Sequence, residues 1–140
     1  MKRLISIAVL TGLIVATGAV RSHGEANPDS PAHGGQIRVA GVYHYELVVA
    51  KDAREEQDSP VVVYITDGAG KKLSTVGATG TATLLAGKLK ATAALQPDGD
   101  NRMKGVAKYA ATPDLKVVVL LTLPGKPAEQ ARFTPLADTK

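Results

Sequence analysis

The stretch LKVVVLLTL, residues 115–123, is apolar on both faces of an extended chain. A second stretch, VVVYIT at residues 61–66, has the same character and runs into DGAG, a hairpin-turn sequence. Short apolar runs that are rich in Val, Ile and Tyr and bounded by turn residues are typical of buried β-strands. We therefore predict two interior strands. The core residues that they supply are Val63, Val117, Val119 and Leu121.

The sequence upstream of these runs alternates between two sets of residues, which predicts a strand with one apolar face. In VYHYELVV, residues 42–49, Tyr43 and every second residue after it share one face. His44 and Glu46 share the other face. The polar pair is therefore expected on the solvent side of the sheet.

The preceding GQIRVAG, residues 35–41, predicts a partner strand for this segment. With a connecting loop of about three residues, Val39 would pair with Tyr43. The same register would place Arg38 opposite His44.

Turn sequences divide the rest of the chain into short segments of β character. Further strands are predicted at residues 71–75, 81–87, 88–95, 102–110 and 131–135, with a hinge at Ala86-Gly87. In total, we expect seven to nine short strands, spaced as in an antiparallel sandwich. The predicted fold is all-β, an antiparallel Ig-like β-sandwich that follows a signal peptide.

The composition disfavours several classes of function. Basic residues number 17 and acidic residues 13, and the basic ones are scattered, so nucleic acid is a poor partner. The absence of Cys excludes disulfides and thiolate chemistry. The aromatic content is 4% with no Trp, which gives a light core without a large cleft. No nucleophile with a matching base is recognisable, and we expect no enzymatic activity.

The first residues have the pattern of an export signal. Lys2 and Arg3 precede an apolar run that ends in small residues, which predicts a signal peptide over residues 1–19. Residues 20–32 are polar and contain two prolines, so they are expected to form a flexible lead-in to a β-sandwich domain at residues 33–140. Periplasmic localisation follows, without a membrane span after cleavage. The alternative is an uncleaved membrane anchor.

Three side chains form the candidate metal site: His33, His44 and Glu46. Imidazole and carboxylate bind divalent and copper ions, and His44 and Glu46 lie two residues apart on one strand face. His33 precedes two glycines, which can bend the chain back towards that face. In an extended hairpin, however, His33 would lie roughly 16 Å from the level of His44, and Arg38 would repel a cation. The alternative is a set of surface histidines near a strand edge.

Several segments together resemble a group of small exported proteobacterial proteins associated with heavy-metal efflux. They are HGGQ, YHYELVV, VYITDGAGKKLS, GATGTATLL, QPDGDNRMKG and TLPGKPAEQARF, which fall between residues 33 and 133. The HGG and YHYELV segments also resemble the N-terminal part of periplasmic adaptor subunits of metal RND pumps. The chain has no room for the helical hairpin, lipoyl-like and barrel domains of a full adaptor. The resemblance implies a metal-related periplasmic role as an accessory protein or detached domain.

Two hypotheses of function follow. The first is a periplasmic accessory protein of heavy-metal homeostasis or efflux that binds a divalent or copper ion or contacts a pump component. The second is a metal-free β-sandwich binding module that contacts another envelope protein through its sheet edge or loops.

The export signal generates a prediction about the mature protein. We expect an N-terminus near Ala19 or Val20, because small residues follow the apolar run and suit signal peptidase. Mass spectrometry of fractionated cells measures this directly. Recovery of only the intact chain beginning at Met1, in the membrane fraction, would contradict it.

Overall fold

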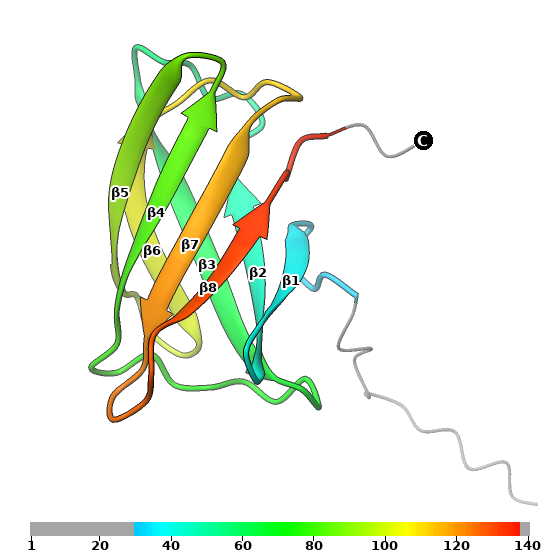
Figure 1. The fold of residues 1–140 in the computed structure, drawn as a ribbon, viewed down its shortest axis with the longest axis vertical. Coiled ribbons are helices and arrows are strands. Elements are labelled where there is room, and N and C mark those ends of the chain that lie inside the picture. Colours follow the sequence, from blue (N-terminus) through cyan, green and yellow to red (C-terminus); the bar gives the residue numbers. More distant parts are fainter. Residues whose placement is uncertain (1–29, 138–140) are drawn as a thin grey trace, which may run out of the picture.

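The structure is a computed structural model that describes residues 30–137, and the expected signal peptide and most of the lead-in lie outside them. The described chain forms eight antiparallel strands joined by turns and loops (Figure 1). They are β1 (Gln36–Ala40), β2 (Tyr43–Val49), β3 (Asp58–Asp67), β4 (Thr79–Ala86), β5 (Leu89–Pro97), β6 (Arg102–Lys108), β7 (Lys116–Thr122) and β8 (Glu129–Phe133). No helix within residues 30–137 has the length and apolar character needed to cross a membrane.

The strands form one nearly closed sheet in the order β1-β2-β3-β6-β5-β4-β7-β8. Between the two halves of the sheet, β5 pairs with β6 only at Gln96↔Lys104 and Pro97↔Met103. The predicted all-β antiparallel class is confirmed. The arrangement is barrel-like rather than clearly a sandwich, because both halves belong to a single curled sheet. The segment at residues 71–75 forms no strand and contributes only an isolated bridge, Thr66↔Lys72.

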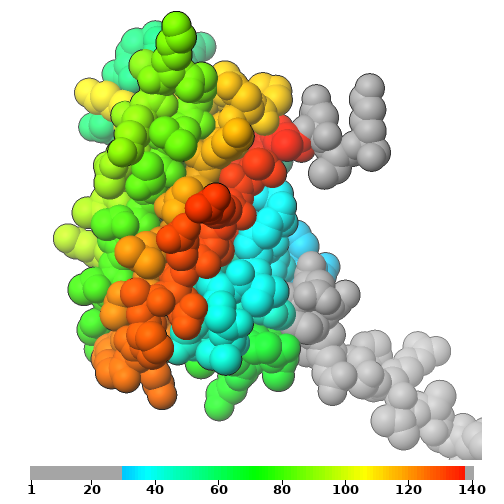
Figure 2. Space-filling model, viewed as in Figure 1, coloured from blue at the N-terminus to red at the C-terminus, as the bar shows by residue number. Residues whose placement is uncertain are grey.

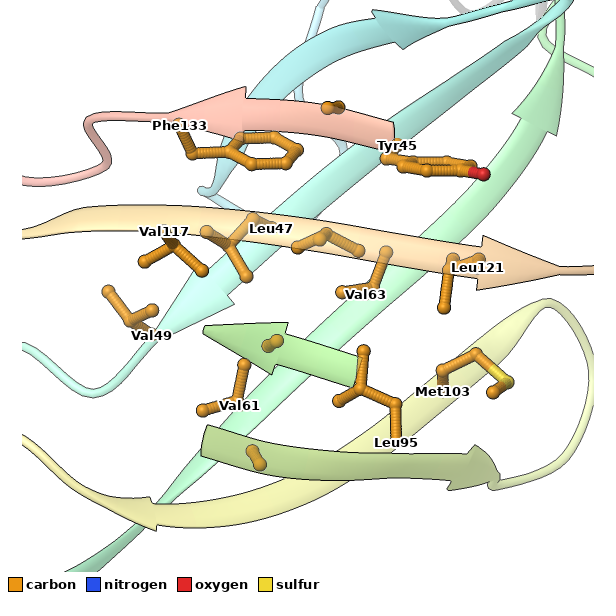
Figure 3. Close-up of a cluster of buried hydrophobic side chains, with 14 of the residues drawn as sticks. Tyr45, Leu47, Val49, Val61, Val63, Leu95, Met103, Val117, Leu121 and Phe133 are labelled. Carbon is orange, nitrogen blue, oxygen red and sulfur yellow. The ribbon is translucent and has the colours of Figure 1, made fainter. Parts of the chain in front are cut away.

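The core lies between the two halves of the curled sheet (Figure 3). The apolar runs supply it as predicted, since Val63, Val117 and Val119 are 0% exposed and Leu121 is 1% exposed. Side chains on alternate positions of the same strands face outwards, and Leu120 is 40% exposed. Tyr45 and Phe133 are the largest fully buried side chains. Most of the other core residues are aliphatic.

The β1–β2 hairpin has a different register from the one predicted. Ala40 pairs with Tyr43 and Val39 with His44, so the loop has only two residues, Gly41 and Val42. Gly41 has a φ of 61°, which suits the first central position of a type II′ turn. This tight turn shifts the pairing by one residue. As a result, Arg38 lies opposite Tyr45 rather than opposite His44.

The burial of β7 predicts how much its side chains contribute to stability. Val119→Ala should lower the free energy of unfolding by about 1 to 3 kcal/mol, because it removes two methyl groups from a closely packed core. Urea denaturation followed by circular dichroism measures the loss. Val76→Ala is the control, because Val76 is 79% exposed. Equal stability of both variants would show that β7 is not central to the core.

Candidate functional site

Glu46 is a buried carboxylate on the outer face of β2. The inward side chains of this strand, including Tyr45 and Leu47, are almost fully buried, and the alternation predicted for residues 42–49 is present. Glu46 faces the other way, yet it is only 6% exposed. A charged group rarely loses its water unless it is paired or hydrogen-bonded. The segment before β1 covers it and supplies its partners.

Both carboxylate oxygens of Glu46 accept hydrogen bonds from this segment. Oε1 accepts from the backbone N–H of Ala32 at 3.2 Å and from the His33 ring at 2.9 Å. Oε2 accepts from the backbone N–H groups of His33 at 2.9 Å and Gly35 at 3.0 Å. Four donors therefore converge on one side chain. The carboxylate fixes the path of the chain ahead of the first strand.

Two glycines allow this close approach. Gly34 has a φ of 73°, a left-handed conformation that side chains disfavour. A Cβ atom at Gly35 would clash with the Leu47 carbonyl group. The chain therefore turns back at Gly34 and lies directly on β2. The extended path that would separate His33 from the level of His44 by roughly 16 Å is not followed, because the backbone is bent at the glycine pair.

The His33 ring stacks on Tyr64 of β3. Their ring centroids are 3.5 Å apart and the planes differ by 2°. Tyr64 pairs with Glu46 across the β2–β3 ladder, so the carboxylate and the aromatic ring support the imidazole together. An ionised carboxylate can only accept hydrogen bonds, so the Nδ1 atom of His33 is the donor to Glu46 and carries the proton when the ring is neutral. The Nε2 lone pair of His33 is then available to a ligand.

His44 lines the same pocket as His33 and Glu46. The pocket has a volume of about 130 Å³ and includes Tyr64 and Lys72 in its lining. His44 lies opposite Val39 on one side, and its Nδ1 atom is buried without a hydrogen-bond partner. The ammonium group of Lys72 is paired with Asp100 at 3.0 Å. The pocket thus holds one imidazole fixed by a carboxylate and a second with an unsatisfied nitrogen.

The three residues predicted for a metal site have different environments in the structure. It joins His33 to Glu46 and places His44 in the same pocket. Both Glu46 oxygens are occupied, so this residue orients His33 instead of projecting a free carboxylate. No cluster of three His, Asp or Glu side chains suited to a metal ion occurs among residues 30–137. The repulsion expected from Arg38 is removed by the register of β1.

Sequence reasoning missed Tyr64 as a site residue. Its outward position follows from the alternation of β3, in which Val63 and Ile65 are buried. The only hairpin-turn sequence near β3, DGAG at residues 67–70, follows that strand and does not connect it to β2. The sequence therefore predicts no register between β2 and β3. The contact between Tyr64 and His33 depends on that pairing and on the fold-back at Gly34.

The bonding of Glu46 predicts a large effect for a nearly isosteric change. Glu46→Gln replaces one acceptor oxygen with an NH₂ group, which would face N–H donors. We expect the free energy of unfolding to fall by roughly 2 to 4 kcal/mol. Hydrogen exchange at the amides of Ala32, His33 and Gly35 should accelerate in parallel. The matched control is Glu56→Gln on the exposed β2–β3 loop. Unchanged exchange at the three amides would show that the carboxylate does not hold the segment.

Comparison with known proteins gives no assignment for this site. No protein-family model, curated protein or solved structure matches the chain. What the site does is therefore argued from its own contacts and chemistry.

Proposed function

We propose that the chain is a periplasmic accessory protein of heavy-metal homeostasis or efflux, which binds a divalent or copper ion through His33 and His44. The observation that carries the proposal is the 2.9 Å contact between His33 Nδ1 and the buried Glu46 carboxylate. Histidines that bind metals almost always donate their other ring N–H to such an acceptor. The periplasmic setting rests on the export signal and on the resemblance to efflux-associated proteins.

The contact supports metal binding in two ways. It fixes the tautomer, so that Nε2 of His33 presents its lone pair. It also makes the imidazole a stronger electron-pair donor to a metal ion. The stacking on Tyr64 also limits rotation of the ring. The His33 side chain remains 37% exposed, which leaves it accessible from solvent. Glu46 acts as the positioning residue behind the ligand.

The second imidazole, His44, suits the same ion. A buried ring nitrogen without a partner loses the hydrogen bonds that it makes in water, and a bound cation would compensate for that loss. Imidazole nitrogen is a ligand for zinc, copper and nickel. Two imidazoles leave the other coordination positions to water or to a partner's side chains. Such an open set suits a cargo ion that is taken up and released, whereas structural sites are closed by four ligands.

Titration calorimetry of the mature protein with Cu(II), Zn(II), Co(II) and Ni(II) tests the proposal. We expect binding that weakens by roughly tenfold or more in His44→Ala and in His33→Ala, because a site with few ligands cannot spare one. Affinity should fall as the pH is lowered, because an imidazole must lose its proton before it can coordinate a metal. The matched control is His23→Ala, a histidine outside the described residues, which should bind like wild type.

The variants also separate the alternatives. Equal binding by wild type and His44→Ala, or a loss caused only by His23→Ala, would remove the proposed ligands. No heat with any of the four ions would leave the metal-free binding module as the remaining hypothesis. Glu46→Gln should weaken binding less than His33→Ala if its carboxylate orients the ligand rather than coordinating the ion.

A further inference from the structure

A seam without ladder pairing separates β1 from β8. Each of these strands forms a ladder on one side only, with β2 and with β7, and they lie next to each other at the edges of the curled sheet (Figure 2). The carbonyl of Ile37 accepts a hydrogen bond from the guanidinium of Arg38 at 3.0 Å instead of from β8. Unpaired strand edges are templates for the backbone of another segment.

The side chain of Gln36 makes hydrogen bonds of the kind that such a backbone would make. The Gln36 amide accepts from the backbone N–H of Thr134 at 2.8 Å and donates to the Thr134 carbonyl at 3.2 Å. An extended residue of a neighbouring strand would make the same pair of bonds. The backbone groups at the end of β8 therefore point into the seam and are geometrically suited to a peptide amide.

A groove of about 320 Å³ opens beside this end of the seam. Its accessible apolar side chains are Leu85 of β4 and Val118 of β7, whereas Phe133 of β8 is buried beneath it. Leu85 is 38% exposed and lies on the outer face of the sheet. The groove thus combines apolar contact area with the residue Thr134, whose backbone groups bond to the Gln36 side chain.

The charged side chains that line the groove are all basic. They are Arg38 of β1, Lys116 of β7 and Arg132 of β8, and all three are exposed. None of them forms an ion pair with a carboxylate in the described part of the chain. The nearby Asp114 is not a groove residue, and its carboxylate accepts hydrogen bonds from Thr112 and Gly87. The charge of the groove lining is therefore positive, and Lys116 also interacts electrostatically with the nearby Asp114.

From this combination we infer that the groove binds an extended acidic segment of a partner protein. Its carboxylates pair with Arg38, Lys116 and Arg132, because basic side chains around a groove select the opposite charge. Its apolar side chains lie on Leu85 and Val118. Its backbone replaces the Gln36 amide at Thr134, directly after the end of β8. The inference is independent of metal binding, since none of these residues lines the histidine pocket.

Fluorescence anisotropy with a labelled ten-residue peptide tests the inference. In the probe, Glu alternates with Val, and both ends are blocked. We expect saturable binding that weakens as salt is added, and no binding of the peptide in which Lys replaces Glu. A decaglutamate peptide should bind more weakly, because it lacks the apolar side chains. In NMR spectra of the protein, the chemical-shift changes of backbone amides on peptide addition should be largest near Thr134 and Arg132.

The variant Arg38→Glu/Arg132→Glu should reduce the affinity by about tenfold or more. Lys51→Glu/Lys126→Glu is the matched control, because it changes the net charge equally at exposed positions outside the groove. Arg38→Gln/Arg132→Gln gives an intermediate affinity and covers the case in which the charge reversal impairs folding. His44→Ala should bind the peptide like wild type.

Three outcomes would overturn the inference. They are equal peptide binding by both charge-reversed variants, a preference for the Lys peptide, and amide shifts confined to residues outside the seam. Binding of vesicles containing anionic lipid without binding of the Glu-Val peptide would also overturn it, because it would assign the basic residues to a membrane surface.

Discussion

The buried carboxylate of Glu46 determines the structure of the chain ahead of the sheet. A charge on an outer strand face would normally remain in water, and covering it is costly unless donors replace that water. Four donors do so, three from the backbone of residues 32–35 and one from His33. The segment is thus held by polar bonds rather than by apolar burial. The orientation of the His33 ring over Tyr64 follows from the same contact.

A second constraint is the closure of an eight-stranded sheet around a light core. Side chains close the seam at both ends, Gln36 at Thr134 and Tyr45 at the Glu129 carbonyl, to which its hydroxyl donates at 3.2 Å. Burial raises the pKa of Tyr45 above its usual range, so the hydroxyl keeps its proton and stays a donor. Side chains can hold two strands close without forming a ladder.

The sequence predicted the structure well where one physical effect dominates. It predicted less where the structure depends on contact between two separate elements. The apolar runs around Val63 and Val119 predicted burial because their hydrophobicity allows no other placement. The register of β1 was predicted wrongly, since periodicity does not distinguish a two-residue from a three-residue turn, and Gly41 decided between them. His33 and Glu46 were proposed together from chemistry, but their contact required the fold-back at Gly34. Tyr64 depended on a long-range pairing that no local pattern reveals.

The strand β1 contributes to both candidate surfaces, and its pleat keeps them apart. Ile37 lines the histidine pocket, whereas Arg38 lines the basic groove. Adjacent residues of a strand point to opposite faces, so a slip of one residue would exchange the two sets. The Gly41 turn prevents that slip by fixing Ala40 opposite Tyr43. The register that removes Arg38 from the neighbourhood of His44 is thus the one that supplies Arg38 to the groove. The single turn therefore determines on which of the two surfaces the charge of Arg38 lies.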